Sequence, residues 1–281
     1  MIWRIIVYST LITLLVLIKC TPIGVRDFLT ELVDVQLYID DHLDCFEHIK
    51  KYKYALQNKI SDDLQPNGRY QNCVWTLWLQ GEENAPQIVK NCIQSLRTYL
   101  KDRRLIVIDE NSLEKYIKLP KHILNKYKSG AMTGTYFSDI VRCCLLYKYG
   151  GLWLDSTVFL TDKFPNKILN QDFFMFSKLW FHRVSKMLTT TWLIYSKNPG
   201  NPILKDIINL SAEYWKHENE LICYNLVFMF FALSVENNPE AKQVFESMPY
   251  IREQLHLSSN YMSTYSDGLL AELIKYSHLP I

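Results

Sequence analysis

The chain has 281 residues, of which 48% are hydrophobic and 14% aromatic. This is enough apolar material for one substantial core, and it excludes a disordered protein. Lysine and arginine number 31 and aspartate and glutamate 29, with neither charge collected in a long block, so no nucleic-acid-binding face is predicted. Seven scattered cysteines lack the paired short spacings of a zinc site and predict reduced thiols, as in a cytosolic protein.

The first residues of the chain are apolar. An uncharged run at 5–18 follows Arg4. It is short for a membrane span, which needs about 20 residues, but it has the length of a signal-peptide apolar region, about 7–15 residues. Because Ile18, Lys19 and Cys20 form a poor cleavage site, we expect 1–20 to be an uncleaved hydrophobic anchor or a membrane-dipping helix. The alternative is an apolar helix packed on the domain itself.

The rest of the chain predicts two regions, a helical N-terminal region at 21–68 and a main domain at 69–281. Apolar side chains recur at helical spacing over 25–60 and predict one or two amphipathic helices. The strands predicted in the main domain are 73–81, 104–111, 152–160, 173–178 and 189–197. The predicted helices are 86–100, 112–127 with a break at Pro120, 138–148 with Ser138 as N-cap, and further helices after Pro202. This alternation indicates an α/β layered domain with a largely parallel sheet.

One stretch, "SDIVRCCLLYKYGGLWLDSTVFL" at 138–160, carries the candidate chemistry. Asp139 and Arg142 are three residues apart and share a helix face, where an ordinary ion pair would also account for them. Asp155 lies between apolar residues of a predicted strand, so we expect it to be buried and to need a partner, hydrogen bonds or a metal. Open α/β sheets bind ligands at the carboxyl ends of their strands, and Gly150–Gly151 allows close backbone approach. We therefore expect a cation at Asp155 to hold a diphosphate, with Arg142 as a bidentate donor and Asp139 accepting hydroxyl hydrogen bonds.

This stretch resembles the capsular polysaccharide synthesis proteins, which belong with the family 32-type glycosyltransferases that carry a DXD-like motif. The preceding "VWTLWLQGEENAPQIVKNCIQSLRTYL" and "LIVIDENSLEKYI" share the resemblance, which covers about residues 70–215. It implies a GT-A-type, Rossmann-like domain that binds a nucleotide sugar, with helical N- and C-terminal additions. It also implies sugar transfer with retention at the anomeric carbon.

The resemblance implies a role for each matching residue. Asp139 and Arg142 would hold hydroxyls of the donor sugar. Asp155 would bind Mn²⁺ or Mg²⁺, with Thr157 as a weaker ligand, and the ion would bridge the diphosphate and stabilise its developing charge. Trp78 would lie against the nucleotide base. The other donor-binding residues implied are Gln80, Gly81, Tyr136, Ser138 and Gly151.

The metal motif departs from that of the wider class. Asp155-Ser156-Thr157 stands where the class has Asp-x-Asp, so a hydroxyl replaces the second carboxylate. Asp109 and Glu110, at the end of the second predicted strand, are either further ligands or a solvated strand end. His278 is left outside the site.

The sequence therefore predicts a membrane-associated glycosyltransferase of surface (capsular) polysaccharide synthesis. It would use a UDP- or GDP-sugar, extend a glycan or lipid-linked acceptor, and hold its catalytic domain in the cytoplasm. One alternative is a Golgi-type glycosyltransferase anchored by 1–20, which oxidised cysteines and a glycan on Asn209 would favour. The other is a non-catalytic nucleotide- or sugar-binding subunit, suggested by the missing second carboxylate.

Overall fold

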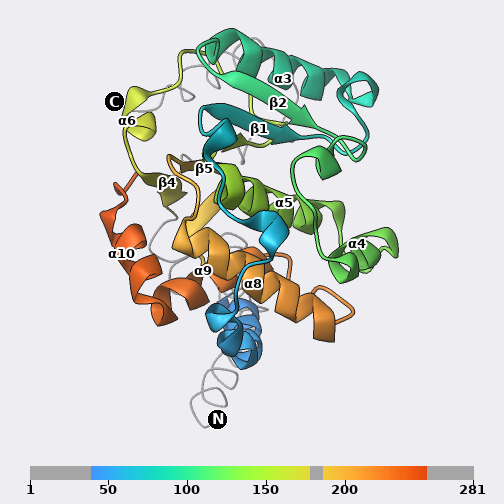
Figure 1. Ribbon diagram of the computed structural model, residues 1–281, viewed down its shortest axis with the longest axis vertical. Coiled ribbons are helices and arrows are strands. Elements are labelled where there is room, and N and C mark those ends of the chain that lie inside the picture. Colours follow the sequence, from blue (N-terminus) through green and yellow to red (C-terminus); the bar gives the residue numbers. More distant parts are fainter. Residues whose placement is uncertain (1–38, 178–185, 252–281) are drawn as a thin grey trace, which may run out of the picture.

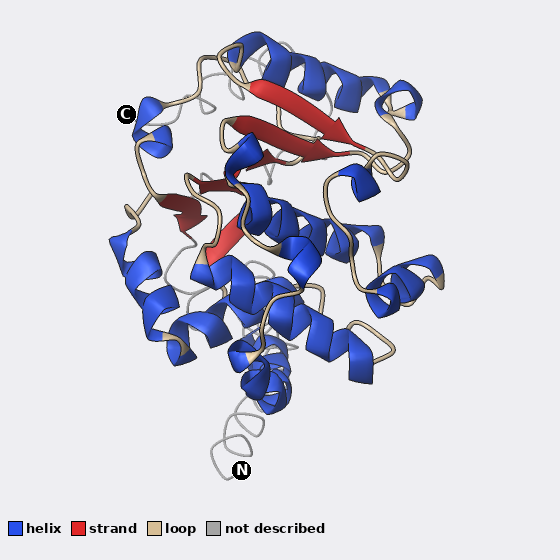
Figure 2. Ribbon diagram, viewed as in Figure 1, coloured by secondary structure: helices blue, strands red, loops and turns tan. Residues whose placement is uncertain are grey.

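The computed structural model describes residues 39–177 and 186–251. Within these ranges, strands form one five-stranded sheet in the order β2-β1-β3-β5-β4 (Figures 1 and 2). The strands are β1 Cys73–Leu77, β2 Arg104–Ile108, β3 Gly151–Leu154, β4 Phe173–Ser177 and β5 Thr189–Ser196. The mixed α/β architecture agrees with the class predicted from the sequence.

The sheet is mixed rather than largely parallel, which corrects the prediction. Strands β2, β1 and β3 run parallel, whereas β5 pairs antiparallel with both β3 and β4. The chain between Ser177 and Thr189 is shorter than the dozen or more residues that a parallel crossover requires, so β4 and β5 can only pair antiparallel. The register of β3 and β5 places residue 191 beside the end of β3.

Helices cover both faces of the sheet (Figure 1). Helix α3 lies over β1 and β2 on one face, and α5 lies on the other face, with α8 and α9 beyond it. The α-helices are α3 Gln87–Tyr99, α4 Lys121–Lys128, α5 Gly134–Tyr149, α6 Asn166–Leu169, α8 Pro202–His217, α9 Leu226–Asn237 and α10 Pro239–Ser247. Residues 39–49 are also helical and continue into the 3-10 helix η1 Lys50–Gln57. The remaining 3-10 turns are η2 Asp62–Leu64, η3 Gly68–Tyr70, η4 Glu82–Asn84 and η5 Leu113–Lys115.

Helix α5 is buried on nearly all sides because it lies between the sheet and α8. Its N-cap is Thr133, whose side chain accepts a hydrogen bond from the Tyr136 backbone N–H at 3.2 Å. The predicted N-cap, Ser138, therefore lies inside the helix, in its second turn. The helix ends at Gly150, whose φ of 70° is favourable only for glycine.

Strand β3 ends at Leu154, so Asp155 follows the strand instead of lying in its middle as predicted. The Asp155 backbone N–H still donates to the Trp192 carbonyl at 2.9 Å, and its carbonyl accepts from Val158 N–H at 2.9 Å. The first bond continues the pairing with β5 by one residue, and the second closes a turn directly after it. Asp155 thus lies at the carboxyl edge, where open sheets place their ligands.

The described residues leave the membrane prediction untested. No helix within 39–177 or 186–251 is both long and apolar enough to cross a membrane. The apolar segment at 1–20 and His278 lie outside the described residues. The division at 20 and 68 stays a prediction.

Candidate functional site

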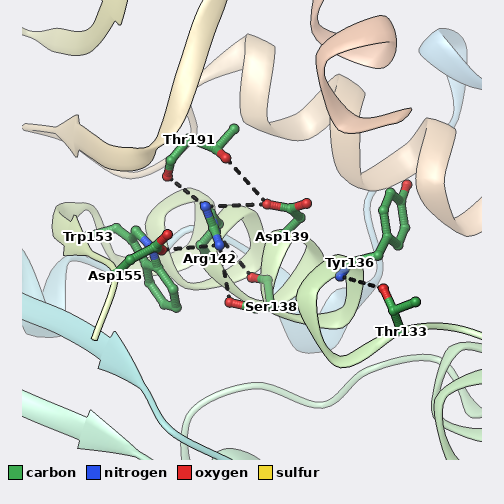
Figure 3. Close-up of polar contacts among 8 residues, drawn as sticks. All are labelled: Thr133, Tyr136, Ser138, Asp139, Arg142, Trp153, Asp155 and Thr191. Carbon is green, nitrogen blue, oxygen red and sulfur yellow. Dashed lines mark hydrogen bonds and ion pairs between the residues drawn. The ribbon is translucent and has the colours of Figure 1, made fainter. Parts of the chain in front are cut away.

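Three charged side chains meet beside the carboxyl end of β3 (Figure 3). Arg142 lies between two carboxylates, with Nη1 3.3 Å from Asp139 Oδ1 and Nη2 3.1 Å from Asp155 Oδ1. Asp139 and Arg142 come from one face of α5, as their spacing predicts, and Asp155 comes from the end of β3. The ion pair within α5 is thus present, but it belongs to a larger cluster.

Arg142 donates three hydrogen bonds to protein acceptors. Nε donates to the Ser138 carbonyl at 3.4 Å, and Nη2 donates to the Ser138 hydroxyl at 3.2 Å. Nη1 donates to the Thr191 carbonyl at 2.7 Å. The two ion pairs with Asp139 and Asp155 complete the surroundings of the guanidinium. The Arg142 side chain is only 4% exposed. Its geometry therefore fits a role in positioning Asp139 and Asp155 better than the predicted role of a bidentate donor to a diphosphate.

Trp153 joins Arg142 to Asp155. Its indole Nε1 donates to Asp155 Oδ1 at 2.7 Å, and the Arg142 guanidinium carbon lies 5.0 Å from the centre of its ring. The second contact is a cation–π interaction between two buried side chains. Sequence analysis missed this role, although alternation along a strand puts residues 153 and 155 on one face.

Asp139 is a buried acid. It is 7% exposed, and burial raises its pKa to about 6 from an ordinary value of 3.8. The Asp155 charge also raises this pKa, whereas Arg142 and the Thr191 hydroxyl, 3.4 Å from Asp139 Oδ1, lower it. Thr191 was not predicted, because only the antiparallel pairing of β5 with β3 brings it here.

Asp155 is the candidate metal ligand that the structure leaves accessible. Its side chain is 31% exposed, and both of its polar side-chain contacts fall on Oδ1, so Oδ2 is the oxygen turned to an added ligand. The described ranges contain no group of three or more His, Cys, Asp or Glu side chains placed to hold a metal. Mg²⁺ is commonly held by one or two carboxylates together with substrate phosphates. Asp155 and the exposed Thr157 could therefore hold a metal only together with phosphate oxygens of a bound substrate.

Asp109 and Glu110 follow β2 at the carboxyl edge of the sheet. Asp109 Oδ1 accepts a hydrogen bond from Ser112 N–H at 2.7 Å, and the Ser112 hydroxyl accepts one from Asp109 N–H at 3.0 Å. Hydrogen bonding of the Asp109 carboxylate to Ser112, mainly to its side chain, lowers the pKa of Asp109. Glu110 is exposed. The interpretation as a solvated strand end therefore fits both residues better.

The predicted base-binding residues form a turn next to Asp155. Gly81 has a φ of 84° and donates its N–H to the Trp78 carbonyl at 3.0 Å, and Gln80 between them is exposed. Because Trp75 pairs with Trp153, continuing the parallel register sets this turn beside Asp155 on the same sheet edge. Trp78 packs against α3, and its Nε1 is buried without a hydrogen-bond partner among the described residues.

Two residues predicted to bind the donor lie elsewhere. Tyr136 is 1% exposed, with its hydroxyl 3.2 Å from the Ser211 hydroxyl, and in Figure 3 its ring points away from Arg142. Gly151 begins β3, at the opposite end of the strand from Asp155. A Cβ added there would lie 2.6 Å from the Cys73 carbonyl, so the glycine serves sheet packing. Ser138, by contrast, does lie in the site, bonded to Arg142.

Comparisons with known proteins agree on one class. The model of the family described as capsular polysaccharide synthesis protein matches residues 26–279. The O-glycosyltransferase PaGT of Phomopsis amygdali is 31% identical over 105 residues, which are 34% of this chain and 26% of PaGT. Glycosyltransferase afumC of Aspergillus fumigatus is 32% identical over 98 residues, 31% of this chain and 25% of afumC. The O-glycosyltransferase braB of Annulohypoxylon truncatum is 30% identical over 96 residues, 31% of this chain and 23% of braB.

The matched segments thus span only about a quarter of each curated relative. No solved structure matches the chain significantly.

Proposed function

The chain belongs to the capsular polysaccharide synthesis protein family, and from this membership we propose that it is a glycosyltransferase that transfers a sugar from a nucleotide-sugar donor to a glycan or lipid-linked acceptor. The names of the three relatives support the activity. The structural observation that supports it best is Arg142 holding Asp139 and Asp155 at the carboxyl edge of β3. In this proposal the sheet with its flanking helices is a GT-A-type domain.

The charges of the cluster suit the proposed reaction. Transfer breaks the bond between the anomeric carbon and a diphosphate oxygen, which leaves negative charge on the diphosphate and develops positive charge on the sugar. Two carboxylates and one guanidinium give the cluster a net charge of about −1 when Asp139 is ionised, which favours the positive sugar. Asp139 is placed to accept a hydrogen bond from a sugar hydroxyl, while Arg142 fixes its orientation.

The residues around Asp155 would receive the diphosphate and the base. Mn²⁺ or Mg²⁺, held jointly by Asp155 and the donor, would neutralise charge on the leaving diphosphate. The Trp78–Gly81 turn adjoins Asp155 on the same edge and would receive the nucleotide base. A UDP- or GDP-sugar, a surface-polysaccharide role and membrane attachment through 1–20 complete the proposal.

Donor hydrolysis tests the proposal most directly. Full-length protein is incubated with a panel of UDP- and GDP-sugars, with and without Mn²⁺, and release of nucleoside diphosphate is followed. We expect metal-dependent release from one donor, lost in Asp155→Ala. The matched control is Asp172→Ala, because the Asp172 side chain is 87% exposed at the start of β4, and this variant should keep wild-type activity. Wild-type turnover in Asp155→Ala would exclude the metal role.

A binding subunit without catalysis is the second candidate function. The observation that favours it is Thr157 in place of the second carboxylate of the motif. Isothermal titration with nucleotide separates the two functions. Nucleotide binding without metal-dependent turnover, also when an oligosaccharide acceptor is supplied, would support the binding subunit.

A further inference from the structure

Cys45 and Cys223 are far apart in the sequence but meet in the fold. Their Sγ atoms are in contact at 2.6 Å across a sequence separation of 178 residues. Cys45 belongs to the helix at 39–49, and Cys223 lies in the loop 218–225, which joins α8 to α9. Cys45 is buried and Cys223 partly exposed. Of the cysteines that the structure describes, these two form the pair with sulfurs in contact.

Further contacts hold the same two segments together. The Asn225 amide lies 2.8 Å from His42 Nε2, one turn before Cys45. At the other end of the loop, Glu218 accepts hydrogen bonds from Lys51 at 2.8 Å and from the Tyr52 hydroxyl at 2.6 Å. Polar contacts thus flank the cysteine pair on both sides, so the two sulfurs meet within a packed interface between the two segments.

We propose that Cys45 and Cys223 form a disulfide that fastens the helix at 39–49 to the loop 218–225, in a compartment where thiol oxidants maintain the bond. The oxidant is a low-molecular-weight disulfide such as oxidised glutathione. The Cys223 thiolate attacks one of its sulfurs and releases one thiol, which gives a mixed disulfide. Cys45 then loses its proton, attacks the Cys223 sulfur and releases the second thiol. Two protein thiols are oxidised, and one external disulfide is reduced to two thiols.

The surroundings of the two thiols suit this order. A hydrogen bond from the Cys45 thiol lowers the pKa of Cys223, and the same bond, together with burial, raises the pKa of Cys45. The thiolate is the attacking species, and it must be reachable by the oxidant. Cys223, partly exposed and with the lower pKa, meets both conditions.

The bridge also bears on the cellular setting. Disulfides persist in secretory compartments and are rare in the cytosol. The bridge would therefore favour the Golgi-type alternative over the cytoplasmic setting. The Asn209 glycan is a poorer marker of that setting, because Asn209 is buried and its amide donates to the Asn58 carbonyl at 2.9 Å.

Alkylation at lysis followed by mass spectrometry tests the proposal on the full-length protein. Cells of the source organism are lysed in N-ethylmaleimide, and the purified protein is digested without reduction. We expect a linked peptide joining Cys45 and Cys223, present also in the control Cys92→Ser and absent from Cys223→Ser. Complete alkylation of both residues before reduction would overturn the proposal.

A thermal scan of the wild-type protein gives a readout that requires no variant to fold. Dithiothreitol should lower Tm by roughly 4–16 °C, as expected for a long loop closed by a disulfide. An unchanged Tm after verified reduction would show that the bond does not fasten the two segments. Neither readout depends on sugar transfer, so failure here and failure of the proposed function are distinguishable.

Discussion

Asp139 ionises inside the protein, and this ionisation should cost stability that a neutral residue would restore. The residue is 7% exposed, and burial raises its pKa to about 6 from 3.8. Asp139→Asn keeps an acceptor oxygen for Arg142 and for the Thr191 hydroxyl but removes the charge. We expect the variant to fold more stably than wild type at pH 7.5 and to lose donor turnover.

The magnitude follows from proton linkage. A pKa of about 6 in the folded state against 3.8 in the unfolded state corresponds to about 3 kcal/mol. Because the folded pKa is the higher one, the favourable contribution is complete below pH 3.8 and is lost as pH rises through about 6. The free energy of unfolding of the wild-type protein should therefore fall by about 3 kcal/mol between pH 3.8 and pH 7 because of Asp139. The variant should not show this decrease.

Urea unfolding at half-unit steps from pH 3.5 to 7.5 measures this difference, with donor hydrolysis assayed on the same samples. Asp172→Asn is the control, because its exposed carboxylate should change the free energy of unfolding by no more than about 0.5 kcal/mol. Equal or lower stability of Asp139→Asn at pH 7.5, with an unchanged pH profile, would contradict this prediction. Such a result would mean that ionisation of Asp139 does not lower the free energy of unfolding of the wild-type protein.

Three further substitutions test Arg142, Glu218 and Gly151. Arg142→Lys cannot reproduce the three hydrogen bonds of the guanidinium, so losing at least one charge-assisted bond should lower kcat/KM for the donor about 10- to 100-fold in steady-state assays. Hydrogen bonds from Lys51 and other partners hold the pKa of Glu218 at about 2, so its stabilisation is present above pH 4.5 and lost as pH falls towards 2. Glu218→Gln should lower the free energy of unfolding by roughly 1–3 kcal/mol at pH 7 and match wild type near pH 2 in acid titrations. Gly151→Ala should lower the urea midpoint by the equivalent of more than about 1 kcal/mol, because its Cβ would collide with the Cys73 carbonyl, while folded protein keeps donor hydrolysis.

Local periodicity carried much of the fold prediction. Strand β1, helix α3 and strand β2 occur in the predicted order, because each buries a continuous apolar face that its sequence displays. The three-residue spacing of Asp139 and Arg142 placed them on one helix face, and the strand-end rule brought Asp155 near them. The match of the capsular polysaccharide synthesis family model confirms the predicted family.

The errors arose where distant segments decide the outcome. Thr133 and Ser138 are both acceptable N-caps, and the packing of the first turn of α5 selects Thr133. The Gly-Gly pair indicated backbone freedom, but only the neighbouring strand shows that Gly151 is required for close packing against β1. Thr191 joins the site through an antiparallel pairing that local periodicity does not specify.

The net charge of the cluster predicts cation dependence independently of a DXD-like motif. With Asp139 and Asp155 ionised, one guanidinium leaves the cluster at about −1, and that guanidinium already bonds to protein acceptors. A donor diphosphate approaching Asp155 would therefore meet repulsion without a free positive partner among these residues. A divalent ion between Asp155 and the diphosphate would reverse the sign of that interaction. Under the proposed function, cation dependence should therefore persist even though Thr157 replaces the second carboxylate, because it follows from the net charge and from the protein contacts that already hold Arg142.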